Sequence, residues 1–286
     1  MNNQRTLLIT TAHPDDETFG SGGTLAHYVA AGVKVYCACG TRGEAGVYEP
    51  ENMKGHATVG DMRWYEFECA ARTLGMEPPV HLGYRDSGMA GSEDNKNPMA
   101  FSRAPVDEVA AKVVKLIREL KPQVIVTSDP IGGYHHPDHI AIHKATMKAL
   151  EVVADPNELP EAGPPFQPQK VYYNVFPRTI LKLTVTLMPL FGQDPKHLGK
   201  NHDIDLASVA NVKFPIHAWV RLSKKERAIR DEAFECYASQ LENRPRRRGL
   251  LDFLQRFNRD DRDAFMRAYP AANGRLREKD LFEGVV

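Results

Sequence analysis

The sequence has no excess of charge, no long apolar run and no cysteine spacing typical of a zinc ribbon. Its 37 Lys and Arg residues balance 37 Asp and Glu residues, which argues against a general nucleic-acid-binding surface. No apolar stretch approaches the roughly 20 residues of a membrane-spanning helix, and the N-terminus shows no signal-peptide pattern. Buried free thiols are expected in a reducing cytosol, at Cys37, Cys39, Cys69 and Cys236. We therefore expect a cytoplasmic protein without a membrane or nucleic-acid partner.

The glycine-rich phosphate loop of nucleotide-binding proteins is also missing. Gly20, Gly22 and Gly23 follow the first expected strand, but their spacing does not match G-x-G-x-x-G. No acidic ribose contact accompanies them, so the pattern disfavours a nucleotide-dependent transferase.

Short β-rich runs alternate with helical patterns in the first half of the chain. Strands are expected at 6–11, 33–38, 80–82 and 124–127, and helices at 22–31, 61–74, 105–120 and 137–150. This alternation predicts an α/β fold with a Rossmann-like parallel sheet and helices on both faces.

A Pro-rich stretch at 155–168 indicates a linker or excursion, and the pattern beyond it is looser. Strands are expected there at 171–176 and 181–187, and one long helix at 222–241, as a smaller irregular α+β part. A basic cluster at 244–248 is typical of a solvated helix end. We expect a single catalytic domain over residues 1–286, in which residues 1–154 form the Rossmann-like portion and residues 169–286 complete its crevice.

The first expected strand is followed directly by His13-Pro14-Asp15-Asp16-Glu17. Sites of open α/β sheets lie in the crevice beyond the carboxyl ends of the strands. Imidazole and carboxylate are ligands for a divalent metal such as zinc, and His13 and Asp16 can point at one ion. Asp15 would then stay off the metal, as the free carboxylate that a hydrolase needs for a general base.

The fourth expected strand is followed by a second loop, Tyr134-His135-His136-Pro137-Asp138-His139. One of His136 and His139 can supply a third metal ligand while the other stays free, and His143 is a rival one helical turn further on. Three protein ligands and a water are the pattern of catalytic zinc. Because both loops converge on one crevice, the sequence predicts a metal-dependent hydrolase.

The two loops resemble the motifs of the zinc-dependent PIG-L/LmbE-like de-N-acetylases. His13-Pro-Asp-Asp-Glu17 is similar to the first family motif and His136-Pro-Asp-His139 to the second, and segments 41–46, 63–66 and 85–89 also look like family segments. Within the family, segments 84–91 and 132–139 look most like the mycothiol-pathway members, the N-acetylglucosaminyl-inositol deacetylase and the conjugate amidase. The resemblance covers residues 6–150 well and the remainder weakly.

For the chemistry, the resemblance implies that His13, Asp16 and His139 hold Zn²⁺ or another divalent metal. Asp15 would be the general base. Protonated His136 would stabilise the oxyanion and help to protonate the leaving amine.

For the surroundings of the metal, the resemblance implies that Tyr134 sits at the mouth of the site and swings onto the carbonyl oxygen. Asp138 would orient a neighbouring histidine. Arg63 and Asp86 match positions that hold sugar hydroxyls. The chain departs from the family pattern at Val47, where a glutamate is expected, at Tyr237, where a histidine is common, and at His135, where a small residue is common.

The expected activity is removal of an N-acetyl group from a small N-acetylglucosaminide-like amino sugar, which yields acetate and the free amine. Two alternatives stay open: an amidase on a larger sugar–thiol conjugate, and a sugar-binding protein with a vestigial metal site. Asp15 argues against the binding protein, which has no use for a spare base. A homo-oligomer is compatible with the sequence.

Overall fold

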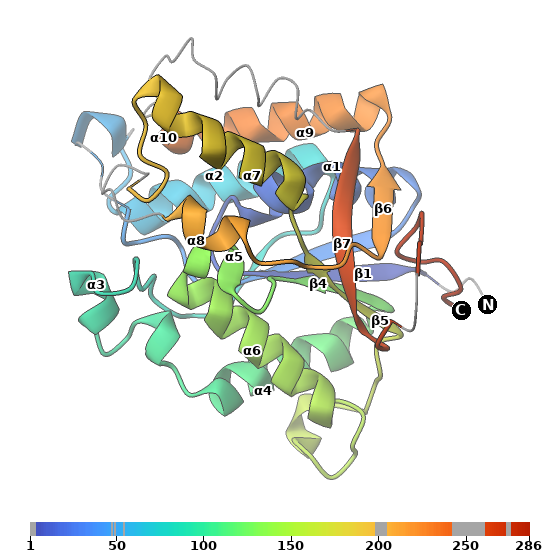
Figure 1. Ribbon diagram of the computed structural model, residues 1–286. Helices are drawn as coiled ribbons and strands as arrows, with labels where there is room; N and C mark the ends of the chain where they lie inside the picture. The colour runs from blue at the N-terminus through green and yellow to red at the C-terminus, as the bar shows by residue number, and fades with distance from the viewer. Residues whose placement is uncertain are drawn as a thin grey trace.

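The computed structural model describes residues 4–46, 48, 50–53, 55–197, 205–241, 261–272 and 276–286. Val47 and the basic cluster at 244–248 lie outside these residues. One seven-stranded sheet runs through the described chain in the order β3-β2-β1-β4-β5-β7-β6 (Figure 1). Its strands are β1 (Thr6–Thr11), β2 (Lys34–Cys39), β3 (Val80–His81), β4 (Val124–Thr127), β5 (Lys170–Asn174), β6 (Ala218–Arg221) and β7 (Arg262–Tyr269).

Helices cover both faces of the sheet (Figure 1). The α-helices are α1 (Asp16–Ala30), α2 (Val59–Leu74), α3 (Glu93–Lys96), α4 (Val106–Leu120), α5 (Gly132–His135), α6 (Pro137–Val152), α7 (Arg178–Leu187), α8 (Leu206–Ala210), α9 (Lys224–Cys236) and α10 (Ala238–Leu241). Short 3₁₀ helices occur at η1 (Pro50–Met53), η2 (Phe101–Arg103), η3 (Pro160–Ala162) and η4 (Met188–Phe191). No helix of the described chain is long and apolar enough to cross a membrane.

The first five strands of the chain are parallel, as the alternating pattern predicts. Leu7 and Ile9 of β1 pack with α1, α2 and α9 on one face, and Leu8 packs with α4 and α6 on the other. All six residues of β1 are buried, which is typical of a central strand of a parallel sheet. The α/β fold with helices on both faces is therefore confirmed.

The C-terminal part extends the same sheet. Strand β7 pairs antiparallel with both β5 and β6, and neither β6 nor β7 was expected from the sequence. The strand expected at 181–187 is wrong, because these residues form α7. Buried or half-buried Leu181, Thr184, Val185 and Met188 recur at helical spacing, and this packing outweighs the β propensity of the run. The long helix expected at 222–241 is two helices, α9 and α10, separated at Tyr237.

The expectation of four free thiols is wrong for two of them. Cys37 and Cys39 are free and buried in β2, but Cys69 and Cys236 form a disulfide between α2 and α9. The two cysteines are 167 residues apart, so only the packing of these helices brings them together.

Candidate metal centre and active site

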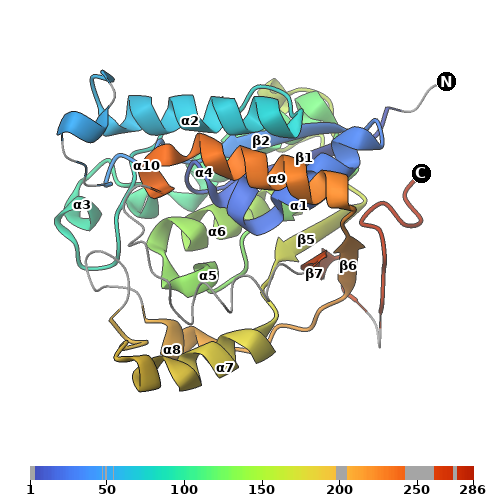
Figure 2. The ribbon, with the colours of Figure 1, turned by 90° about the horizontal axis from the view of Figure 1, so that it is seen from above.

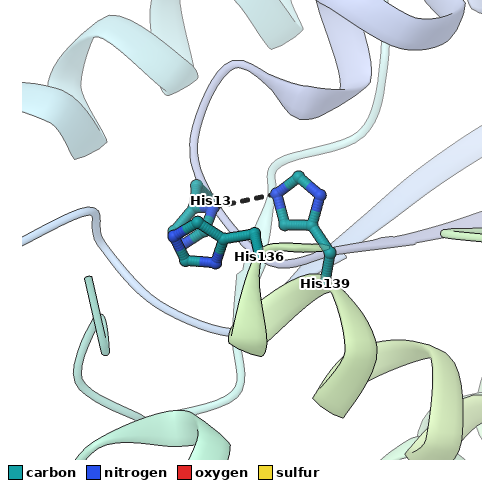
Figure 3. A group of neighbouring side chains, drawn as sticks. All are labelled: His13, His136 and His139. Carbon is teal, nitrogen blue, oxygen red and sulfur yellow. Dashed lines mark hydrogen bonds between the residues drawn. The ribbon is translucent and has the colours of Figure 1, made fainter. Parts of the chain in front are cut away.

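Two loops meet at the carboxyl ends of β1 and β4, which are neighbours in the sheet. His13 lies in the loop between β1 and α1, whereas His136 caps the N-terminus of α6 and His139 lies in its first turn. Figure 3 shows the three rings pointing toward one another from these two elements. The sheet topology thus brings together residues more than 120 positions apart.

Three of the predicted ligands face one another closely. His13 Nδ1 lies 3.2 Å from His139 Nε2, which lies 3.3 Å from Asp16 Oδ1. Asp16 Oδ2 lies 3.8 Å from His13 Nδ1. Tetrahedral zinc, with bonds of about 2.0–2.2 Å, sets its ligand atoms roughly 3.3–3.6 Å apart. The donor set and its spacing therefore fit a divalent metal such as zinc.

The far side of the His13 ring faces two carboxylates. His13 Nε2 lies 3.2 Å from Asp138 Oδ2 and 3.4 Å from Asp86 Oδ1. Asp138 is fully buried and accepts hydrogen bonds from the Ser87 amide, at 2.9 Å, and from the Ser87 hydroxyl. Burial disfavours the charged form of His13, but these carboxylates raise its pKa well above the usual value. A metal at Nδ1 would displace the proton there, while the carboxylates would keep the proton on Nε2.

Asp16 is kept ionised by its surroundings. Burial alone would raise its pKa, but His139 and His13 lower the pKa below the usual value. Its Oδ2 also accepts hydrogen bonds from the amides of Ala12, at 3.1 Å, and His13, at 2.9 Å. An ionised carboxylate held in this way has its other oxygen, Oδ1, directed at His139.

The two remaining histidines of the second loop and helix differ in position. His143 Nδ1 lies 2.9 Å from the Ser128 carbonyl, and its ring packs against Tyr173, so it does not join the other histidines. His136 also comes within ligand distance of His13 and His139, since one nitrogen of each lies within 4.8 Å of the others. Asp16 Oδ1 also approaches His139 Nε2, at 3.3 Å, so Asp16 and His136 are both candidates for the third ligand, and the family resemblance favours Asp16.

His136 is neutral in the resting site. Its Nδ1 accepts the Asp138 amide at 3.2 Å, which places its own proton on Nε2. Burial and the neighbouring His13 and His139 lower the pKa of His136 to about 2. A bound divalent cation would lower the pKa further. The resting site therefore differs from the expectation of a protonated His136, although the neutral ring still offers an N–H donor.

Asp15 stands beside the candidate ligands in a left-handed backbone conformation, with φ of 107°. Arg63 of α2 donates to Asp15 Oδ2 at 3.0 Å and to the Pro14 carbonyl at 2.7 Å. A Cβ at Gly43 would lie 2.1 Å from Arg63 Nη1, so glycine there admits the guanidinium. Burial raises the pKa of Asp15 to about 6, and Arg63 offsets part of this rise. A carboxylate of this pKa suits a general base near neutral pH.

The structure brings Tyr134, Asp86 and Arg63 to the same site. The Tyr134 ring packs edge-on against His136 and His139, and burial raises the pKa of its hydroxyl, which therefore stays protonated. Asp86 accepts the Gly88 amide at 2.8 Å as well as facing His13. Arg63 and Asp86 thus both touch catalytic candidates, and their contact with a sugar stays a prediction.

Sequence reasoning missed residues that support this site from behind. Ser87 holds Asp138, and Glu44 accepts the amide of Asp86 at 3.0 Å. Both lie in segments that resemble the family, 85–89 and 41–46, which was the available signal. Glu17 accepts the amide of Asp15 at 3.1 Å, and nothing in its spacing indicated that contact.

The fold and site together define an α/β protein with a candidate divalent-metal centre at the ends of neighbouring parallel strands. Residues 8–150, half of the chain, match the family described as PIG-L: GlcNAc-PI de-N-acetylase. The chain belongs to this family.

Curated relatives carry one recurring name. The chain is 44% identical over 184 residues to a 1D-myo-inositol 2-acetamido-2-deoxy-alpha-D-glucopyranoside deacetylase of Streptomyces scabiei, which covers 61% of this chain and 57% of the relative. A protein of the same name from Geodermatophilus obscurus is 41% identical over 203 residues, which cover 68% of this chain and 69% of the relative. The match thus spans less than two thirds of the first relative's length.

Solved structures share the fold at low identity. The conserved protein TT1542 of Thermus thermophilus aligns with a TM-score of 0.58 and 21% identity over 94% of this chain and 96% of its own. N,N'-diacetylchitobiose deacetylase of Pyrococcus horikoshii aligns with a TM-score of 0.62 and 18% identity, over 93% of this chain and 84% of its own. The 4-carboxy-2-hydroxymuconate hydratase GalB of Pseudomonas putida also aligns, with a TM-score of 0.59 and 16% identity, over 96% and 100%. At these identities the likeness concerns the fold alone.

Proposed function

We propose that the protein is a zinc-dependent hydrolase that removes the N-acetyl group from a small amino sugar. One observation carries the proposal: Asp15, a carboxylate with a pKa of about 6, stands beside His13, Asp16 and His139 without being one of them. A metal-binding protein without catalysis has no need for a half-buried carboxylate that is not itself a metal ligand. The fold alone would not decide the reaction, because a hydratase shares it.

His13, Asp16 and His139 would hold the ion. When bound, zinc supplies a water of lowered pKa and polarises the amide carbonyl. Asp15 takes a proton from the attacking water, and Arg63 keeps the carboxylate oriented toward it. The hydroxide adds to the acetyl carbon, the C–N bond breaks, and the proton passes to the leaving nitrogen. Acetic acid and a free amine result, and transfer of the acid proton to the amine gives acetate and ammonium, so atoms and charge balance.

The acetyl oxygen gains negative charge during this step and needs donors. The Nε2–H of neutral His136 and the hydroxyl of Tyr134 are the candidates, since His136 is buried and Tyr134 half-buried in the site and both carry a proton at neutral pH. Preorganised donors of this kind stabilise an oxyanion without reorganisation. The neutral His136 donates a hydrogen bond here, and Asp15 returns the proton to the amine.

The substrate class follows from the relatives. Proteins at 40–44% identity are named as deacetylases of an N-acetylglucosaminyl inositol, so we propose an N-acetylglucosaminide of this size as substrate. The conjugate amidase and the vestigial binding protein are not favoured. A cytoplasmic location and a homo-oligomer stay predictions.

The direct test is a substrate panel on the zinc-loaded protein. The panel contains N-acetylglucosaminyl inositol, N,N'-diacetylchitobiose and a sugar–cysteine conjugate, with acetate and free amine measured separately. We expect stoichiometric acetate and amine from the first substrate. Binding of that sugar without release of acetate would contradict the proposal, and the Asp15→Asn variant is the control for contaminating activity.

A further inference from the structure

A buried carboxylate lies directly behind the proposed base. Glu17 of α1 is fully buried, and the described residues give it no ion pair. Its Oε1 accepts hydrogen bonds from the hydroxyls of Thr18 and Tyr237, the latter at 2.6 Å, while its Oε2 accepts the Asp15 amide at 3.1 Å. Three neutral donors thus fix this carboxylate, and one of them is the backbone of the base.

The Asp15 backbone needs such support. Its φ of 107° belongs to the left-handed region, which a residue with a Cβ adopts only when its surroundings compel it. The Asp15 carbonyl accepts the amides of Thr18 and Phe19, and Arg63 binds the side chain. The contact to Glu17 is the one that holds the amide of Asp15, and hence the turn that aims the carboxylate.

Tyr237 reaches Glu17 from a point 220 residues away in the sequence. It lies between α9 and α10, where the Cys69–Cys236 disulfide and the Ser239 contacts to Glu66, at 2.8 and 2.6 Å, fasten the chain to α2. The side chain is fully buried, so it cannot touch a substrate. Figure 2 shows α9 and α10 running beside α1 and α2, which explains how the contact forms.

We propose that Tyr237 is a positioning residue for the reaction: its hydroxyl orients the Glu17 carboxylate, which holds the amide of Asp15 and so sets the position of the base. The inference rests on the proposed role of Asp15. In this role Tyr237 touches no substrate and affects the reaction only through the position of Asp15. Loss of the Tyr237 hydroxyl leaves Oε1 of Glu17 held by the Thr18 hydroxyl alone, so the carboxylate is less firmly oriented and its contact with the Asp15 amide weakens.

The experiment compares Tyr237→Phe with Tyr172→Phe. Tyr172 is a close match, because it is equally buried and donates its hydroxyl to a buried carboxylate, Glu278, at 2.8 Å. Glu278 also accepts from Lys170 and Arg267, which are not among the candidate site residues. Both variants remove one hydroxyl oxygen: Tyr237→Phe loses the hydrogen bond to Glu17, and Tyr172→Phe loses the one to Glu278 and a longer one, at 3.4 Å, to the Leu281 carbonyl. We expect only Tyr237→Phe to lower kcat, by about 10-fold to 10²-fold, as small misplacements of catalytic groups do. KM and zinc content should stay unchanged in both.

A second readout needs no activity. The exchange rate of the Asp15 amide proton, followed by NMR in the zinc-loaded protein, should rise in Tyr237→Phe and not in Tyr172→Phe. If Tyr237→Phe does not fold, Thr18→Val takes its place. This variant removes the other hydroxyl that donates to Glu17, with little change of side-chain shape, and should also lower kcat and speed exchange of the Asp15 amide.

Equal kcat in the two phenylalanine variants, or an unchanged Asp15 amide in Tyr237→Phe, would overturn the inference. If no substrate is deacetylated even by the wild type, the proposed function fails, and the amide exchange still decides whether Tyr237 positions Asp15.

Discussion

Asp15 and Asp16 are adjacent in sequence but are predicted to do different work, and replacing each by its amide separates the two roles. Asp15 lies 3.0 Å from Arg63, and its amide oxygen in Asp15→Asn can still accept that hydrogen bond. The variant should therefore fold and keep its zinc. It should lose the general base, which commonly contributes about 10²–10⁴-fold, or roughly 3–5 kcal/mol of activation free energy.

Asp16→Asn should fail in a different way. One Asp16 oxygen faces His139 at 3.3 Å, and the other accepts two backbone amides. Asparagine has a single oxygen, so its NH₂ must face either the metal or two N–H groups. Loss of a residue that only hydrogen-bonds to a metal ligand commonly lowers metal affinity by about 10–100-fold. Either orientation of this asparagine changes the ligand itself, so we expect zinc affinity to fall by at least this much.

The assay is zinc content by mass spectrometry after dialysis against a graded chelator, together with kcat on N-acetylglucosaminyl inositol at saturating zinc. Asp107→Asn, at an exposed position on α4, is the control for the amide exchange itself. We expect full zinc and low kcat for Asp15→Asn, and low zinc for Asp16→Asn. The assignment of base and ligand is refuted if both variants lose zinc equally, or if Asp15→Asn turns over like the wild type.

Three further changes test other parts of the structure. His13→Ala and His139→Ala should each lower zinc content and activity, whereas His143→Ala should not, because its Nδ1 lies at the Ser128 carbonyl; zinc loss in His143→Ala alone would show the third ligand to be wrong. Asp86→Ala should cut kcat/KM on an N-acetylglucosaminide far more than on a small acetamide without hydroxyls, measured on both substrates. Arg118→Met should lower the free energy of unfolding in urea by about 3 kcal/mol or more, because the buried guanidinium donates to six backbone carbonyls, with zinc content unchanged.

The N-terminal half of the fold could be predicted because each segment there shows the hydrophobic pattern of either a strand or a helix, but not of both. The strand at 124–127 begins with three consecutive apolar residues and is buried throughout, and the helix at 105–120 has one apolar face. The run at 181–187 alternates and also repeats at helical spacing, so local pattern could not choose between the two structures. Strand β7 carries charges at Arg262, Asp263 and Arg267, which hid it from a search for apolar runs.

The meeting of the candidate metal ligands could be predicted because their chemistry and their position agree. Two motifs that end neighbouring parallel strands must meet, so His13 and His139 needed no knowledge of side-chain packing. The protonation of His136 could not be predicted in this way. It depends on burial and on the Asp138 amide at Nδ1, and both are properties of the folded loop.

Arg63 and Asp86 lie at the candidate site, as expected, but in the structure each contacts another site residue. A guanidinium and a carboxylate suit sugar hydroxyls, yet here Arg63 pairs with Asp15 and Asp86 lies 3.4 Å from His13. Both side chains are buried, so a sugar that bound to Arg63 or Asp86 would also affect the position of Asp15 or of His13, the residues that they contact. Binding of the correct sugar and alignment of the reacting groups would then be one event. Comparison of two substrates therefore discriminates between roles: a loss in Asp86→Ala confined to the sugar supports a direct contact, whereas an equal loss on both substrates assigns Asp86 to His13.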